Sequence, residues 1–122
     1  MKPKLLIVDD DEMVLKALRL ELEERYAVVA THEPAEVLPL ARKEKPDLIL
    51  CDIEMPGMDG GDLSAALFAD PALGGIPVLF LTGLASPADL TNTRGQLGGR
   101  PAVSKSAPVE ELIKRIDALL LG

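Results

Sequence analysis

One short apolar run that ends in a carboxylate limits what this chain can fold into. Residues Leu48 to Cys51 form the run, Pro46 and Pro56 lie on either side of it, and Asp52 follows it directly. A run this short between such residues is typical of a strand covered on both faces, not of a buried helix. In an open parallel sheet, ligands bind beyond the carboxyl ends of the strands. Asp52 is therefore predicted to lie at a ligand-binding edge.

Four more segments are predicted to be strands, at residues 5–8, 26–30, 76–81 and 102–104. Helical patterns alternate with them. Asp11 is expected to cap the first helix, and Pro34 to begin the second, which Pro39 should kink or delay. The third helix spans about 62–69, the fourth, after Ser86, should be short or mobile, and Pro108 opens the last.

This alternation indicates a doubly wound parallel sheet of the α/β class. Right-handed crossovers leave few topologies for it, and of these we expect the flavodoxin-like (βα)5 fold. It is a three-layer sandwich in which a five-stranded parallel sheet, in the order 2-1-3-4-5, carries helices on both faces. In this order the first and third strands are neighbours. The carboxylates after Val8 and Cys51 should then meet at one edge.

The composition fits one acidic domain. The chain has 122 residues and is 48% hydrophobic, so residues 1–122 are predicted to form a single domain, either complete or cut from a longer protein. Its net charge of -7 argues against nucleic acid and membrane surfaces as partners. The single cysteine, Cys51, lies in a buried run, and the sequence contains no signal peptide or membrane-spanning run. These features predict a cytoplasmic protein.

The predicted topology brings polar residues from four strand ends to one crevice: Asp9, Asp10, Asp52, Thr82 and Lys105. Two carboxylates about 4 Å apart repel each other by about 4 kcal/mol at an effective dielectric near 20. A dication would relieve this repulsion, and oxygen ligands with open positions suit Mg²⁺ or Mn²⁺. Asp10 and Asp52 are expected to be direct ligands, and Asp9 a ligand through water.

The same crevice has the groups for phosphoryl transfer. A carboxylate beside Mg²⁺ can attack a phosphoryl group and form an aspartyl phosphate. Lys105 would supply a second positive charge and Thr82 a hydroxyl to the phosphoryl oxygens. Asp52 is the predicted nucleophile.

Five motifs occur in order at the predicted strand ends: Val8-Asp9-Asp10, Pro46 to Asp52, Met55 to Gly60, Leu81-Thr82-Gly83 and Ser104-Lys105. Together they closely resemble receiver domains of bacterial two-component response regulators. The resemblance covers essentially the whole chain. It implies that Mg²⁺ is held by Asp9, Asp10, Asp52 and the backbone carbonyl of Glu54.

The resemblance also implies a function. Asp52 would be phosphorylated by a histidine kinase or a histidine phosphotransfer protein, and Thr82 and Lys105 would contact the phosphoryl group. The signal would pass to a downstream protein partner or an output domain, or to a phosphorylation-dependent homodimer. Such a protein is a phosphoacceptor switch that catalyses only its own phosphorylation and dephosphorylation, not an enzyme with a separate substrate.

The chain departs from the family pattern at two places near its end. Family members carry Pro after the lysine, joined by a cis peptide, whereas Ser106 follows Lys105 here. A cis bond to a residue other than Pro costs about 3 kcal/mol, so the strain is retained or the loop is rebuilt. The family's switch aromatic stands where this chain has Ala102, so coupled rotation of Thr82 with a ring is unavailable.

Two other functions stay open from the sequence. A degenerate receiver could act as a phosphorylation-independent docking or dimerisation module, which the departures around Lys105 favour. A phosphatase resembling haloacid dehalogenases would also use a strand-end Asp, a Thr, a Lys and Mg²⁺. Those enzymes need a second Asp where this chain has Glu54.

Overall fold

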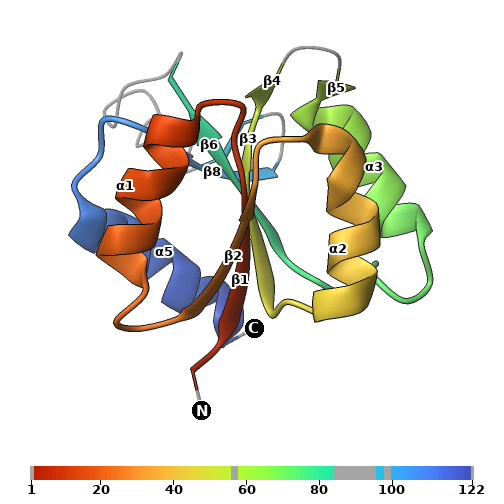
Figure 1. The fold of residues 1–122 in the computed structure, drawn as a ribbon, viewed down its shortest axis with the longest axis horizontal. Coiled ribbons are helices and arrows are strands. Elements are labelled where there is room, and N and C mark those ends of the chain that lie inside the picture. Colours follow the sequence, from red (N-terminus) through yellow and green to blue (C-terminus); the bar gives the residue numbers. More distant parts are fainter. Residues whose placement is uncertain (1, 56–57, 84–95, 98–99, 122) are drawn as a thin grey trace.

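Five parallel strands form the centre of the computed structural model, which describes residues 2–55, 58–83, 96–97 and 100–121 (Figure 1). Their order, β2-β1-β3-β6-β8, is the predicted 2-1-3-4-5 order. All four pairings are parallel. The strands are β1 (Lys4–Val8), β2 (Ala27–Thr31), β3 (Leu48–Asp52), β6 (Val78–Thr82) and β8 (Arg100–Ser104).

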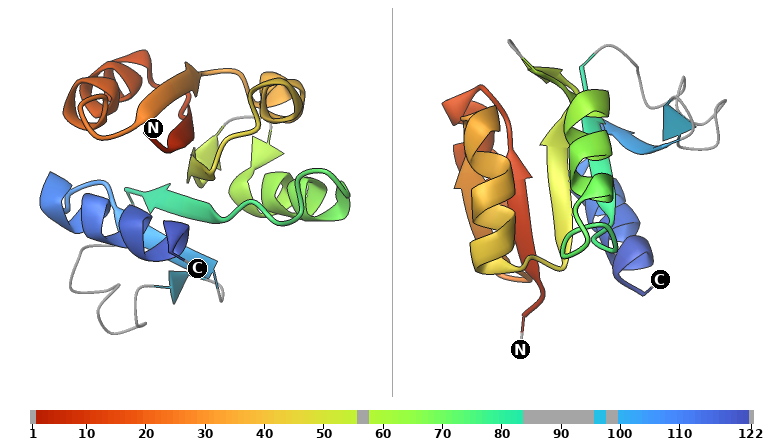
Figure 2. Two further views of the ribbon diagram at one scale, coloured as in Figure 1. Left: turned by 90° about the horizontal axis from the view of Figure 1, so that it is seen from below. Right: turned by 90° about the vertical axis from the view of Figure 1, so that its right-hand side faces the viewer.

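Helices cover both faces of this sheet, as predicted. Figures 1 and 2 show α1 and α5 on one face and α2 and α3 on the other, so the molecule has three layers. The helices are α1 (Glu12–Leu22), α2 (Val37–Glu44), α3 (Gly60–Ala69) and α5 (Val109–Leu120). The fourth predicted helix lies outside the described residues.

Side chains alternate along each strand between two separate cores. In β1, Leu5 and Ile7 pack with the residues of α1 and α5, whereas Leu6 and Val8 pack with those of α2 and α3. All four side chains are fully buried. The unbroken apolar runs of the sequence therefore reflect strands that are buried on both faces.

Local chemistry sets where the first two helices begin. The Asp11 side chain caps α1 by accepting a hydrogen bond from the backbone N–H of Met13, at 2.9 Å, as predicted. Pro34 opens a 3₁₀ turn (Pro34–Glu36), and α2 begins after it at Val37. Pro39 is thus in the first turn of α2, where its missing N–H has no partner within the helix. The sequence predicted that Pro39 would either kink the helix or delay its start, and in the structure the start is delayed.

Three short strands were not predicted. β4 (Glu54–Met55) and β5 (Met58–Asp59) pair antiparallel directly after β3, and Figure 1 shows them above its end. β7 (Gln96–Leu97) pairs antiparallel with β8 and adds a sixth strand at the edge of the main sheet. Two-residue strands carry no periodicity, so no sequence pattern indicated them.

In the described part of the chain, no helix combines the length and apolar character needed to cross a bilayer.

Candidate functional site

Buried polar residues mark one edge of the sheet. Among the described residues, each parallel strand contributes one such residue at or just beyond its carboxyl end: Asp9, Thr31, Asp52, Thr82 and Ser104. The other buried residues in the described part of the chain are classed as hydrophobic. The edge predicted to bind a ligand is therefore also the edge at which the buried polar side chains lie.

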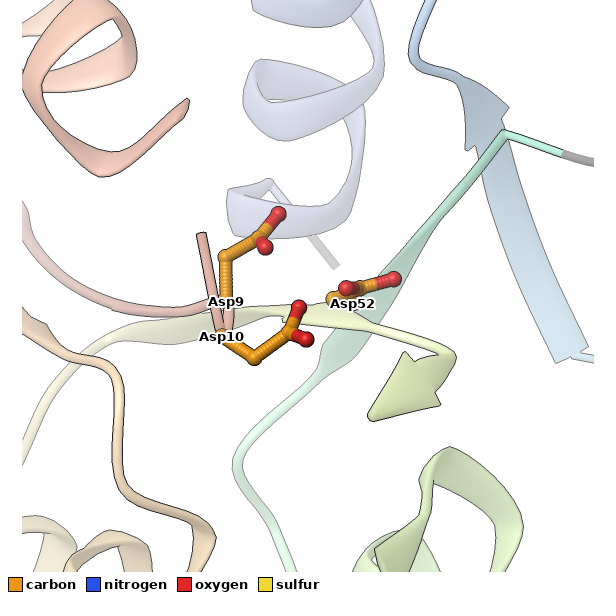
Figure 3. A group of neighbouring side chains, drawn as sticks. All are labelled: Asp9, Asp10 and Asp52. Carbon is orange, nitrogen blue, oxygen red and sulfur yellow. The ribbon is translucent and has the colours of Figure 1, made fainter. Parts of the chain in front are cut away.

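Three carboxylates meet at the ends of β1 and β3. Asp9, Asp10 and Asp52 each offer an oxygen, and these oxygens lie within 4.8 Å of one another. Figure 3 shows the three carboxyl groups gathered beside the ends of the two strands. Asp9 and Asp52 are buried, whereas Asp10 is exposed. The cluster thus has two carboxylates buried in the protein and one, that of Asp10, exposed to solvent.

The oxygen atoms of Asp9 suit a dication. Its Oδ1 accepts a hydrogen bond from the backbone N–H of Asp11 at 3.0 Å. Its Oδ2 is buried and has no hydrogen-bond partner of good geometry among the described residues. Clustered carboxylate oxygens with one such atom match the hard, oxygen-preferring ions Mg²⁺ and Mn²⁺. The cluster could therefore hold a divalent metal, while the Glu54 carbonyl as a ligand stays a prediction.

Lys105 connects the two buried carboxylates. Its Nζ lies 3.1 Å from Asp9 Oδ2 and 3.2 Å from Asp52 Oδ2. Burial lowers the pKa of Lys105, but contacts with Asp9 and Asp52 outweigh burial, so this pKa lies above its ordinary 10.5. The ammonium is thereby held in its charged form beside Asp52.

Thr82 and Cys51 flank Asp52 in different ways. Thr82 ends β6 as a fully buried residue, and β6 lies beside β3 with Asp52 in register with Leu81. Cys51 is buried as predicted. Burial first, and then the charges of Asp52 and Asp9, raise the pKa of its thiol to about 12. The thiol is therefore protonated and unreactive, which leaves Asp52 as the predicted nucleophile of this strand end.

The loop after Lys105 is rebuilt around serine. The described residues contain no cis peptide bond, so Lys105 and Ser106 are joined in trans. The N–H of Ala107 donates to the carbonyl of Ser104 at 3.0 Å, which closes a four-residue turn. The sequence predicted either a strained cis bond or a rebuilt loop after Lys105, and it did not single out Ser106 as a structural residue.

Ala102 fills the place of the family's aromatic residue with a small, fully buried side chain. It pairs with Phe80 across β6 and β8 and packs with the α2 and α3 core. Its carbonyl accepts a hydrogen bond from Nη1 of Arg115 in α5, at 3.2 Å.

Comparison with known proteins agrees with this geometry. Residues 5–117 match the family model described as the response regulator receiver domain. The protein PilH of Pseudomonas aeruginosa is 34% identical over 120 residues, and the polar-differentiation response regulator DivK of Brucella anthropi is 35% identical over 121 residues. Each match covers 98% of both chains.

Solved structures are similar over the whole chain. A putative response regulator from Chloroflexus aurantiacus superposes with a TM-score of 0.84 at 30% identity, and the match covers 100% of both chains. The chemotaxis response regulator CheY4 of Vibrio cholerae gives a TM-score of 0.80 at 26% identity, covering 98% of this chain and 99% of that one. With the family model matching most of the chain, and with the strand order and strand-end carboxylates in place, this chain belongs to the response regulator receiver domain family.

Proposed function

We propose that this receiver domain is a Mg²⁺-dependent phosphoacceptor that takes a phosphoryl group onto Asp52 and changes its affinity for a partner. One observation carries the proposal: Asp52 is buried at a strand end, in a cluster with two other carboxylates, and 3.2 Å from a lysine ammonium. The oxygens of these three carboxylates lie within 4.8 Å of one another, and a bound cation would offset their mutual repulsion.

In this proposal Asp9, Asp10, Asp52 and the backbone carbonyl of Glu54 hold the metal. A bound Mg²⁺ supplies positive charge that offsets the charge of the phosphoryl oxygens. Mn²⁺ has the same preference for oxygen ligands and can take its place.

Asp52 acts as the nucleophile. One of its carboxylate oxygens forms a bond to the phosphorus of a phosphohistidine as the phosphorus–nitrogen bond breaks. The histidine nitrogen leaves with the bonding electrons and takes up a proton. For loss of the phosphoryl group, a water oxygen attacks phosphorus, and the products are the Asp52 carboxylate and inorganic phosphate. The domain thus catalyses only its own phosphorylation and dephosphorylation.

Lys105 and Thr82 act on the phosphorylated form. The ammonium of Lys105, which pairs with Asp52 Oδ2, exchanges that oxygen for a phosphoryl oxygen. Thr82 offers its hydroxyl from the neighbouring strand end. Both side chains would then respond to whether Asp52 carries a phosphoryl group.

The partners follow from the family. A histidine kinase or histidine phosphotransfer protein is the donor, and a downstream protein, an output domain or a second copy of the chain receives the signal. Residues 1–122 act as one receiver unit, either alone or as part of a longer regulator. The buried, protonated Cys51 fits a reducing, cytoplasmic location.

Intact mass measurement tests this function. The protein is incubated with Mg²⁺ and acetyl phosphate, and the expected result is a gain of one phosphoryl group that a chelator blocks. Asp52→Ala should show no gain. Asp47→Ala is the matched control, because Asp47 lies just before the same strand but at its other end, and it should be labelled as fully as wild type.

Two outcomes would contradict the proposal. Full labelling of Asp52→Ala would show that Asp52 is not the acceptor. Failure of the folded wild type to accept a phosphoryl group from both acetyl phosphate and a phosphorylated kinase would favour a phosphorylation-independent docking module instead.

A further inference from the structure

The side chain of Lys105 alone does not fix the position of its ammonium. Its ammonium must lie between Asp9 and Asp52, yet it is carried on a flexible four-carbon stem that is 28% exposed. Such a stem gives a precise position to its ammonium only if the backbone that carries it is itself fixed.

Both peptide groups that flank the Cα of Lys105 are fixed by hydrogen bonds. Before it, the N–H of Lys105 donates to the carbonyl of Thr82 at 2.8 Å. After it, the N–H of Ser106 donates to the side-chain Oγ of Ser104 at 3.2 Å. Because each bond orients one peptide plane, together they set the two backbone dihedral angles of Lys105.

The Oγ of Ser104 is itself held. It lies 2.8 Å from the Oγ of Ser106, in a hydroxyl pair in which either group can donate. Ser104 is 4% exposed, so water is a poor substitute for these contacts, whereas Ser106 is exposed. The hydrogen bond from the N–H of Ala107 to the carbonyl of Ser104 already closes this turn. The two contacts of the Ser104 hydroxyl with Ser106 are therefore not needed to form the turn.

We propose that Ser104 and Ser106 are positioning residues for Lys105, with the Oγ of Ser104 fixing the peptide bond after the lysine and the hydroxyl of Ser106 fixing that Oγ. The consequence for phosphoryl transfer rests on the function proposed above. The positioning itself does not, because it concerns only the described contacts of the unphosphorylated protein.

The first experiment measures the position of the ammonium directly. NMR relaxation of the Lys105 ¹³Cε methylene is compared with that of exposed Lys43 in the same protein. Wild type should show a more ordered methylene at Lys105 than at Lys43. Ser104→Ala should lower the order at Lys105 to that of Lys43, Ser106→Ala should lower it partway, and Ser104→Thr, which keeps the hydroxyl, should preserve it.

The second experiment asks whether the serine acts through the lysine. Ser104→Ala should slow labelling by acetyl phosphate about tenfold, because small displacements of catalytic groups reduce rates strongly. In a Lys105→Ala background the same change should have no further effect, which a general structural role for Ser104 would not produce. Thermal unfolding of each variant checks that it is folded.

The outcomes separate this inference from the proposed function. A Lys105 methylene that is equally ordered in wild type and Ser104→Ala would overturn the inference, as would equal slowing in both backgrounds. If no variant is labelled but Ser104→Ala still releases the Lys105 methylene, the positioning stands and the phosphoacceptor function fails.

Discussion

The two ends of the same five strands handle charge in opposite ways. At the amino end, Lys4 Nζ pairs with Glu44 at 3.2 Å, and these side chains are 36% and 26% exposed. At the carboxyl end, Lys105 is flanked by Asp9 and Asp52, whose side chains are 0% and 2% exposed. One end satisfies its charges near water, whereas the other buries two carboxylates against one ammonium.

The difference extends to the hydrogen bonds that join segments at the amino end of the sheet. The backbone N–H of Lys4 donates to Asp47 Oδ2 at 2.7 Å, and the N–H of Ala27 donates to the carbonyl of Pro3 at 2.8 Å. Each of these contacts joins two segments that lie far apart in the sequence. At the other end three carboxylates face one ammonium, so a cation bound there would stabilise the fold.

The largest effect should come from removing the ammonium of Lys105 at the carboxyl end of the sheet. Lys105→Ala removes the ammonium that lies between Asp9 and Asp52, so it should lower the free energy of unfolding by about 3 kcal/mol and labelling by about a hundredfold. Lys4→Ala at the amino end should cost less than about 1 kcal/mol and leave labelling unchanged. Urea unfolding and intact mass measure the two quantities, and equal losses of stability in the two variants would remove the contrast between the ends.

A divalent metal should stabilise the fold through the carboxyl end. At about a hundred times its dissociation constant, Mg²⁺ should raise the free energy of unfolding by about 2.7 kcal/mol, and a chelator should reverse this. Asp10→Asn should abolish the effect. Asp11→Asn is the neighbouring control, since Asn also caps helices and the metal effect should persist. Metal stabilisation that survives in Asp10→Asn would place the ion elsewhere.

At the amino end, a pH effect should appear that owes nothing to the carboxylate cluster. Burial, followed by the hydrogen bond to Asp117, raises the pKa of Tyr26 to about 12 from its ordinary 10.0. Because the folded pKa is the higher one, this stabilisation is complete below about pH 10 and is lost as the pH rises toward 12. Its size is on the order of 2 kcal/mol.

Tyr26 is the only tyrosine and the chain has no tryptophan, so tyrosinate absorbance reports this residue alone. The native protein should titrate near pH 12, and the loss of stability between pH 10 and 12 should be smaller in Tyr26→Phe. A native tyrosinate titration at pH 10 would contradict the buried hydrogen bond.

The smallest effect should follow from Asp47→Asn. The amide keeps an acceptor for the N–H of Lys4 but loses the charge, so the free energy of unfolding should fall by about 0.5 kcal/mol. Labelling and metal stabilisation should be unchanged. A loss of metal stabilisation in this variant would mean that the two ends of the sheet are coupled.

Most of the central sheet could be predicted because its strands are buried on both faces. Each strand is then a short apolar run, and the alternation of strands and helices with right-handed crossovers leaves few strand orders besides 2-1-3-4-5. The cap at Asp11 and the delay at Pro39 were also predictable, because each depends on a single residue and its neighbours. The β4–β5 pair and β7 were not, since two residues carry no pattern.

The candidate site was predictable in its members but not in its contacts. The topology placed Asp9, Asp10, Asp52 and Lys105 at one edge, and the structure brings them together. The sequence could not show that Lys105 contacts both buried carboxylates, because the position of a long side chain depends on its backbone. It also could not show the turn of Ser104 and Ser106, in which each contact is between near neighbours with no periodicity.

The spread of the site along the chain has a consequence during protein synthesis. Asp9 emerges from the ribosome early, while Lys105 lies beyond β8, the last strand of the sheet. A chain that is unfinished, or cut by a protease ahead of β8, keeps all three carboxylates but lacks the ammonium that lies between Asp9 and Asp52. Such a chain should be labelled far less than the whole domain, so the late position of Lys105 ties efficient transfer to completion of the sheet.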